Sequence, residues 1–369
     1  MLVVLNLKLS AKERAIRADE FVHWCIDGLF ICVDSFLLHF PLLMTIVLFQ
    51  ECSAMNELIQ RMKSTETALT DARAKQVIDL IQKLKVTHTA LVVGDDDCKM
   101  MVRTEPLGTS QWEEFSPCPQ KSTGYSACAS PDGIIISGGC IDNENHAIST
   151  CYMYDVGKGH WVQLPSMQKA RYWHGSIYHD GGLYVVGGLN DPSYLQTSYL
   201  DSVERLDMQS HQWTALPSLP QALGLPLVVS VSGKLYALGG GNASWKESLD
   251  VYEYTGRAWQ PKSKMPFGSL GCAAVEFNGC IFVVGGDERR CMRYDPRTDQ
   301  WSHMKQPQFK HWRGAGALYH KNILLLGGEE NDQIEQFDPQ ADSWSQWQVR
   351  MPWKNDMRFA FFINNYKKE

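Results

Sequence analysis

Residues 280–301 read CIFVVGGDERRCMRYDPRTDQW and contain the unit from which most of the chain is built. An apolar run of five residues ends in the pair Gly285-Gly286, and Trp301 follows Tyr294 by seven positions. These features recur along the chain. Glycine pairs begin at positions 138, 187, 239, 285 and 327, with spacings of 49, 52, 46 and 42 residues. A period of this size indicates a repeat architecture.

Each unit predicts four antiparallel strands, here called a to d in chain order. The apolar run before each glycine pair is typical of a strand b buried on both faces. Turns that favour positive φ should join strand a to strand b. We expect these turns at Asp132-Gly133, Asp180-Gly181, Ser232-Gly233, Asn278-Gly279 and Lys321-Asn322. Strand c carries a Tyr, Phe or Leu, and strand d carries the Trp seven residues later. Repeated four-stranded sheets must stack to bury their faces, which predicts a β-propeller.

Five units are complete, and a sixth is divided between two distant segments. Residues 90–95 resemble a strand b that leads to Trp112, but no strand a precedes them. Residues 357–363 resemble a strand a with nothing after it. We therefore expect an all-β, six-bladed propeller over residues 89–365, its ring closed by the C-terminal strand 357–365. The Trp series and the residue seven positions earlier are predicted to pack between blades.

The combined Gly-Gly, Tyr and Trp pattern, at a period of about 50 residues, resembles the kelch repeat. The Trp-Asp dipeptides of WD-repeat propellers are absent. Leu206 stands where other units have an aromatic residue, and Tyr252-Glu253 where others have Tyr-Asp. The chain thus resembles the kelch-like (BTB-BACK-kelch) family. That resemblance implies a protein-interaction module, the substrate-recognition propeller of a cullin-RING ubiquitin ligase adaptor, which acts in ubiquitin-dependent protein degradation.

Residues 1–88 carry no repeat and predict a short helical segment. Apolar residues at 55, 58, 59 and 62, and again at 77, 80, 81 and 84, have the spacing of amphipathic helices. In the kelch-like family a BTB and a helical BACK domain precede the propeller, and residues 39–43, HFPLL, resemble a BACK segment. We interpret 1–88 as a BACK remnant, too short for both domains. A shortened family member, a fragment and an imperfect gene model remain alternatives.

Amino-acid composition limits the classes of partner that we expect for the protein and the cellular compartment in which we expect it. The net charge of −6 and the pI of about 6.0 argue against nucleic acid as the main partner. The eleven cysteines include no Cys-x-x-Cys pair, which favours reduced thiols in the cytoplasm. Residues 28–49 are apolar but contain Asp34, His39 and Pro41. We interpret them as buried helices, with a membrane segment as the alternative.

No catalytic motif is present. The chain lacks a phosphate-binding loop, a His-Glu-x-x-His zinc helix and a nucleophile elbow, so we predict no enzyme, no cofactor and no metal. Asp95-Asp96-Asp97 is interpreted as a solvated loop rather than a cation site. Two alternatives remain: an actin-binding or cytoskeletal kelch protein, and an enzyme on a kelch propeller. Cys272 and Tyr294 could serve a copper oxidase, but convergent His ligands are not evident.

The predicted binding site is one end of the ring. In antiparallel blades the loops from strand d to the next strand a (d–a loops) and those from strand b to strand c (b–c loops) exit at the same end. Residues 171–173 and 311–313 lie at the same distances before the glycine pairs at 187 and 327, so the two segments should occupy equivalent loops. Arg, Trp and Tyr are the residue types that dominate interfaces, and Arg forks suit carboxylates. The predicted partner is a protein or an acidic peptide, with a cullin scaffold on the N-terminal region. The candidate residues are Arg171, Tyr172, Trp173, Trp245, Arg289, His311, Trp312, Arg313 and Arg358.

Overall fold

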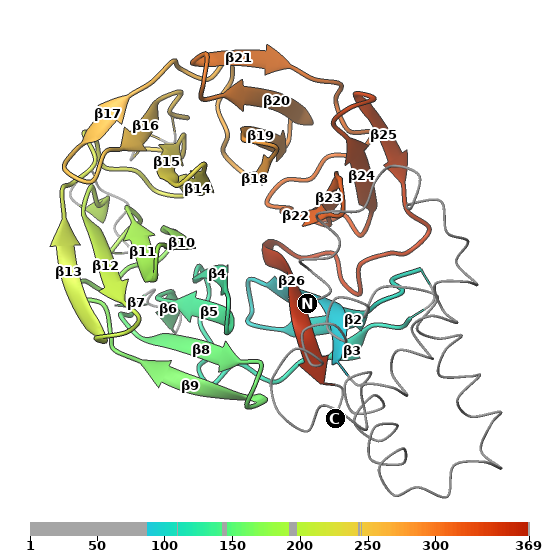
Figure 1. Ribbon diagram of the computed structural model, residues 1–369, viewed down its shortest axis with the longest axis horizontal. Coiled ribbons are helices and arrows are strands. Elements are labelled where there is room, and N and C mark those ends of the chain that lie inside the picture. The colour runs from blue at the N-terminus through green and yellow to red at the C-terminus, as the bar shows by residue number, and fades with distance from the viewer. Residues whose placement is uncertain are drawn as a thin grey trace, which may run out of the picture. The chain divides into compact units, whose positions relative to one another are not determined.

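The computed structural model describes residues 87–367, except 109, 142–145, 192–197, 243 and 245. This part of the chain is all-β and forms six four-stranded sheets arranged as the blades of a ring (Figure 1), which confirms the predicted six-bladed propeller. The predicted helical segment, the apolar stretch 28–49 and Trp245 lie outside the described residues. Within the described residues, no helix is long and apolar enough to cross a membrane.

The blades are numbered from the one that contains the first described strand. Blade 1 has the strand order β26 (Met357–Lys367), β1 (Thr87–Asp95), β2 (Met100–Thr104), β3 (Glu113–Glu114). Blade 2 has β4 (Ser126–Ser130), β5 (Gly133–Ser137), β8 (Cys151–Asp155), β9 (His160–Leu164), and blade 3 has β10 (Gly175–His179), β11 (Gly182–Val186), β12 (Val203–Asp207), β13 (Gln212–Leu216). Blade 4 has β14 (Leu227–Val231), β15 (Lys234–Leu238), β16 (Val251–Tyr254), β17 (Trp259–Pro261). Blade 5 has β18 (Cys272–Phe277), β19 (Cys280–Gly285), β20 (Arg290–Asp295), β21 (Gln300–His303), and blade 6 has β22 (Ala315–Tyr319), β23 (Asn322–Leu326), β24 (Ile334–Asp338), β25 (Ser343–Gln346).

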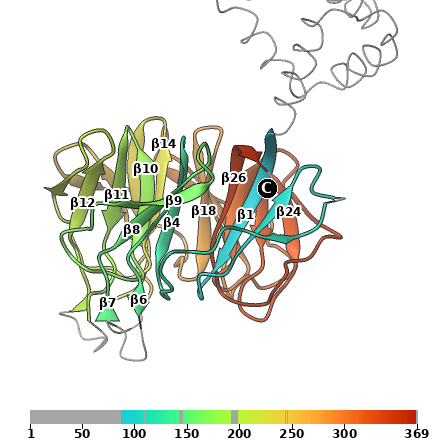
Figure 2. The same cartoon turned by 90° about the horizontal axis from the view of Figure 1, so that it is seen from below.

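The first strand of each blade lies innermost, at the ring axis (Figure 1). A small hairpin, β6 (Cys140–Ile141) with β7 (His146–Ala147), belongs to the b–c loop of blade 2. Figure 2 shows this hairpin projecting from one end of the ring, which identifies the end at which the b–c and d–a loops emerge.

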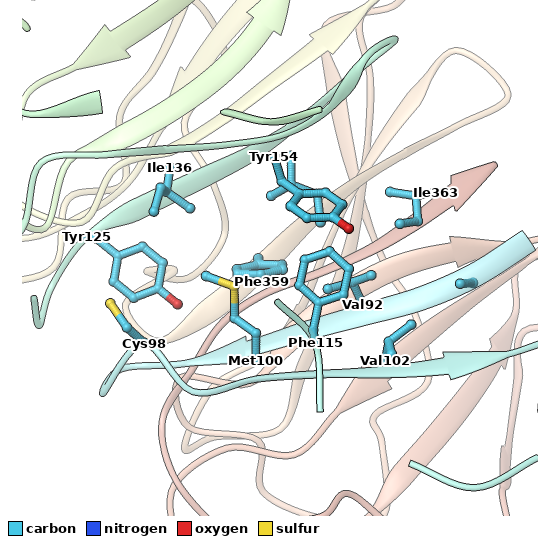
Figure 3. Close-up of a cluster of buried hydrophobic side chains, with 12 residues drawn as sticks. Val92, Cys98, Met100, Val102, Phe115, Tyr125, Ile136, Tyr154, Phe359 and Ile363 are labelled. Atoms are coloured by element: carbon cyan, nitrogen blue, oxygen red, sulfur yellow. The ribbon is translucent and has the colours of Figure 1, made fainter. Parts of the chain in front are cut away.

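Blade 1 joins the C-terminal strand to the first described strands. β26 lies beside β1, so the strand that comes last in the chain takes the innermost place of a sheet whose other strands come first. Its side chains enter the core, since Phe359, Ala360 and Ile363 are almost fully buried. Figure 3 shows Phe359 between Val92 of β1 and residues of blade 2, in one cluster of apolar side chains that bridges the two blades.

Two-residue turns join strands a and b. Both turn residues have positive φ at Asp180-Gly181, Ser232-Gly233 and Asn278-Gly279, as their sequences predict. Two other turns lie one residue earlier than predicted, at Pro131-Asp132 and His320-Lys321.

The two displaced turns have separate causes. Gly133 already belongs to β5, and a Cβ there would lie 1.8 Å from the Tyr154 carbonyl oxygen. This glycine therefore permits the close approach of strand c rather than the turn. At the other turn His320 itself adopts the positive φ of 52°.

The Trp at strand d of each blade fastens that blade to the one before it. Each indole N–H donates a hydrogen bond to a backbone carbonyl that follows strand d of the preceding blade, at 2.6–3.3 Å. Trp112 of blade 1 donates to Arg350 after blade 6, so the series runs round the whole ring. The predicted packing role is confirmed, and the hydrogen bond adds direction to it.

Removing residues 357–369 should destabilise the entire propeller. The deletion exposes the edge of β1 and takes Phe359 and Ile363 out of the core, so we expect a loss of at least about 4–5 kcal/mol in the free energy of unfolding, or failure to fold. Thermal and urea denaturation measure this, with deletion of 368–369 alone as the control. A truncated protein that melts within about 2 °C of the full chain would contradict the role of β26.

Two substitutions at Trp301 should separate its hydrogen bond from its packing. The ring lies 5.0 Å from Tyr294 and its N–H donates to Ser263. Trp301→Phe keeps the ring contact and should cost about 1 kcal/mol, whereas Trp301→Ala also leaves a cavity and should cost about 3 kcal/mol. Denaturant midpoints measure both. If the alanine variant unfolds at the wild-type midpoint, the tryptophan does not fasten the blades.

Candidate functional site

A cavity of about 410 Å³ runs along the ring axis. The innermost strands line it, and many of their side chains there are small, including Ser126, Ala127, Ser176, Ala273 and Gly316. Among the described lining residues, Arg313 and Arg358 carry a charge. The charged groups of this channel are therefore at its mouth, because Arg313 lies in a d–a loop and Arg358 is the second residue of the strand after one.

Backbone geometry positions the residues of the mouth. In five of the six d–a loops the equivalent residue is left-handed, with φ of 65° at Gly124, 50° at Trp173, 53° at Leu225, 71° at Gly271 and 53° at Arg313. Hydrogen bonds link these loops in succession. The Trp173 N–H donates to the Gly124 carbonyl at 2.7 Å, that of Leu225 to Trp173 at 2.6 Å, and that of Arg313 to Gly271 at 2.9 Å.

The left-handed conformation is costly for residues with a Cβ. Trp173 and Arg313 nevertheless adopt it, and their side chains meet at the mouth. The Arg313 guanidinium carbon lies 5.5 Å from the centre of the Trp173 ring and 5.9 Å from that of Trp312. Trp173 and Arg313 come from loops on opposite sides of the ring, after blades 2 and 5. Contacts of this kind contribute about 0.5–2 kcal/mol each, depending on desolvation.

Each arginine of the mouth also pairs with a carboxylate. Arg313 Nη1 lies 2.5 Å from Asp356, and Arg358 Nε lies 2.6 Å from Asp96. The same Asp96 oxygen accepts the Gly124 N–H at 2.6 Å. Burial raises the pKa of Asp96, but the hydrogen bond and charge of Arg358 outweigh it, so the pKa of Asp96 lies below its ordinary value.

The arginines keep donor capacity beyond these pairs. Arg313 Nε and Arg358 Nη2 are buried and have no hydrogen-bond partner among the described residues. The Arg358 side chain is only 8% exposed. Buried guanidinium N–H groups without acceptors are costly, so the mouth favours an added acceptor such as a carboxylate or a carbonyl oxygen.

Three predicted contact residues are buried, and for them the expected direct contact with a partner is wrong. Arg171 is fully buried, and it donates to the Gly187 and Ser202 carbonyls and pairs with Glu204 at 2.5 Å. Tyr172 is 1% exposed, and its hydroxyl donates to the Asp191 carbonyl.

His311, the third, occupies the position of Arg171 in blade 6. It is fully buried, with its ring nitrogens 2.7 Å from the Gly327 carbonyl oxygen and 3.0 Å from Glu335. The partners explain the burial. Glu204 and Glu335 occupy equivalent positions of strand c, and each also accepts two backbone N–H groups of the same d–a loop. Arg171 and His311 therefore fix the conformation of their d–a loops, and their side chains do not form a contact surface for a partner.

The remaining described candidates fall into two groups, those at the mouth and one outside it. Trp173, Trp312, Arg313 and Arg358 come together at the mouth as described. Arg289 is exposed on the b–c loop of blade 5 and donates to the Gln308 carbonyl at 3.2 Å, apart from this cluster.

Sequence reasoning missed the two acidic partners. The loop Asp95–Asp97 is not simply solvated, because Asp95 is buried and accepts the N–H groups of Asp97 and Lys99, and burial raises its pKa. The run of three aspartates next to a strand was the available signal. No group of three or more His, Cys, Asp or Glu suited to a metal occurs among the described residues.

The Asp96–Arg358 pair should make stability depend on pH. Asp96→Asn leaves Arg358 without its carboxylate and should cost about 1–3 kcal/mol at neutral pH. Because the folded pKa of Asp96 is lowered, its contribution is present above the ordinary aspartate pKa and is lost as the pH falls. The gap between wild type and variant should thus shrink from about pH 7 to about pH 3, as measured by urea denaturation. Asp97→Asn, exposed in the same turn, is the control, and a gap independent of pH would argue against the pair.

The chain is similar in sequence to known proteins that contain kelch motifs. The kelch motif matches residues 121–168, 170–220 and 269–308. Kelch-like protein 35 of Mus musculus is 26% identical over 288 residues, which cover 74% of this chain and 47% of that protein. Kelch-like protein 38 of Rattus norvegicus is 25% identical over 255 residues, covering 65% of this chain and 43% of that protein. The chain thus spans somewhat under half the length of these curated relatives.

A solved structure supports the fold alone. The structure of YjhT superimposes with a TM-score of 0.56 at 14% sequence identity, over 70% of this chain and 97% of that one.

Proposed function

We propose that this kelch-repeat propeller, a protein-interaction module, captures an acidic and partly apolar segment of a partner protein at the mouth of its channel. The observation that carries the proposal is the pair of arginines, Arg313 and Arg358, each of which has a buried donor atom without a hydrogen-bond partner among the described residues. An Arg fork can engage a carboxylate through two parallel hydrogen bonds. Trp173 and Trp312 flank Arg313 and offer aromatic surface to neighbouring apolar groups.

The carboxylates of Asp356 and Asp96 determine how an acidic segment can bind to the two arginines of the mouth. Asp356 and Asp96 already balance the two arginines, so an incoming carboxylate shares or exchanges these partners. Arg313 is the first group that a ligand meets, because its side chain is 23% exposed against 8% for Arg358. Loss of Asp356 should therefore strengthen the binding of an acidic segment, and loss of Arg313 should weaken it.

Opposite effects of two substitutions test the proposal. Peptides selected from a random library on the wild-type propeller should be enriched in Asp or Glu beside aromatic or aliphatic residues. Arg313→Gln should weaken a selected peptide about 10-fold or more, since a charged hydrogen bond contributes about 1.5–3 kcal/mol. Asp356→Asn should tighten it, and changing the peptide's Glu to Gln should remove both effects. Calorimetric titration measures affinity, and melting curves check folding.

Two outcomes would overturn the proposed mouth. One is a selected peptide set without acidic enrichment. The other is an affinity that Arg313→Gln leaves unchanged in a folded protein. Arg289→Gln, an exposed arginine outside the mouth, is the matched control and should leave the affinity as it is.

We further propose that the module serves as the substrate-recognition part of a cullin-RING ubiquitin ligase adaptor in the cytoplasm. The support is the similarity to kelch-like proteins and the helical pattern of residues 1–88. Affinity purification from cells should recover a cullin with the full chain and lose it when residues 1–86 are removed, while partners of the propeller are recovered with both. Absence of a cullin from the full-chain sample would remove the ligase role and leave the interaction role standing.

A further inference from the structure

Two cysteines from different loops converge at the end of the ring that carries the mouth. Cys98 lies in the b–c loop of blade 1, between β1 and β2, and Cys118 lies in the d–a loop from blade 1 to blade 2. Both sulfurs approach one acceptor, because Cys118 Sγ is 3.0 Å and Cys98 Sγ 3.7 Å from the Gln120 carbonyl oxygen. Cys98 is labelled in Figure 3 beside Tyr125, at the edge of the cluster between blades 1 and 2.

We propose that Cys98 and Cys118 form a redox-active thiol pair, which hydrogen peroxide converts into a disulfide that ties the β1–β2 turn to the d–a loop from blade 1 to blade 2. The two thiols have unequal surroundings, which assigns their roles. A hydrogen bond from Cys118 lowers the pKa of Cys98, and bonds with Ser122 lower it further against the opposing effect of burial. The hydrogen bond to Cys98 raises the pKa of Cys118. The Ser122 N–H also donates to Cys98 Sγ at 3.4 Å, a bond that stabilises a thiolate, so we assign Cys98 as the nucleophile and Cys118 as the resolving thiol.

The reaction is balanced by one peroxide. The Cys98 sulfur, having lost its proton, attacks one peroxide oxygen, the O–O bond breaks, and the leaving hydroxide takes up that proton as water. The sulfur of Cys118 then attacks the sulfenic sulfur of Cys98, the S–O bond breaks, and hydroxide leaves with the Cys118 proton as a second water. The two thiols are oxidised and the peroxide is reduced.

The partial exposure of Cys118 distinguishes this pair, because the other described cysteines are buried. Cys118 is partly exposed, and Cys98, at 8%, lies directly beside it. Cys128 and Cys151 of blade 2 also share one cluster, but they are buried between blades 2 and 3, and burial raises the pKa of each to about 12. Thiols of that kind are poor nucleophiles, so oxidation should be selective for the first pair.

The disulfide would act on the mouth. Cys98 Sγ donates to the Ser122 carbonyl at 2.9 Å and accepts its N–H at 3.4 Å. Two residues on, Gly124 donates to Asp96, which holds Arg358. Drawing Cys98 toward Cys118 removes the sulfur from Ser122 and so alters the support of that turn, whichever partner the mouth takes.

Peptide mapping tests the pair on the full chain. Trypsin should release residues 86–99 and 104–121, each with a single cysteine. After treatment with increasing hydrogen peroxide and alkylation of the remaining thiols, a cross-linked species of these two peptides should become dominant, and dithiothreitol should abolish it. The oxidised protein should also melt at a higher temperature, because the disulfide reduces the conformational entropy of the unfolded chain.

Variants define the roles of the two sulfurs. Cys118→Ser keeps a hydrogen-bond donor but no resolving sulfur, so Cys98 should accumulate as a sulfenic acid that dimedone captures. Cys140→Ala, next to Thr123 in the same region, should leave the cross-link unchanged. The proposal is overturned if the folded wild-type protein yields the two peptides separately at every peroxide dose, or if Cys118 is joined to a different cysteine.

Discussion

Close contact between backbones at the glycine pairs determines how the blades stand against one another. A Cβ on Gly138 would lie 2.2 Å from the Arg171 carbonyl oxygen, and the Gly139 N–H donates to that oxygen at 2.9 Å. The next pair repeats this contact, where the Gly188 N–H donates to Leu223 at 2.8 Å. Any side chain at these positions would push the neighbouring d–a loop away. Since those loops carry the mouth, its geometry depends on the glycines as much as on the residues that line it.

The repeat made the fold predictable because strand periods and turns are local properties of the chain. The candidate site was only partly predictable. Equal offsets placed Arg171 and His311 in equivalent loops, but their orientation depends on Glu204 and Glu335, whose significance appears only when strand c lies beside the loop. The meeting of Trp173 with Arg313 depends on the diameter of the closed ring, which no local pattern encodes. Offsets along a repeat specify the place of a residue, and its partners decide whether it faces solvent.

Blade 1 combines closure of the ring with the chemistry of the mouth. β26 supplies Arg358, the β1–β2 turn supplies Asp96 and Cys98, and Asp356 stands just before β26. The Asp96 N–H donates to the Asp356 carbonyl at 3.0 Å, so the two acidic partners are joined through the backbone. The charged half of the mouth is therefore assembled only when the two distant segments of the chain have come together. At this blade, closure of the ring and assembly of the charged half of the mouth therefore occur together.

Because β26 pairs with β1, the blade at which the propeller's chain begins and ends is arbitrary, although the order of the blades is not. Thr89 donates to Asn364 at 3.2 Å, and the pairing continues to Asp96 and Asp356, so the two strands run in opposite directions. Lys367 thus ends on the side where β1 begins, in the arrangement that a two-residue turn spans in the other blades. A short linker from 367 to 87 would supply the missing turn, and the ring could then be opened at another a–b turn. Such a circular permutant would keep every contact of the mouth while its new ends lay in a different blade.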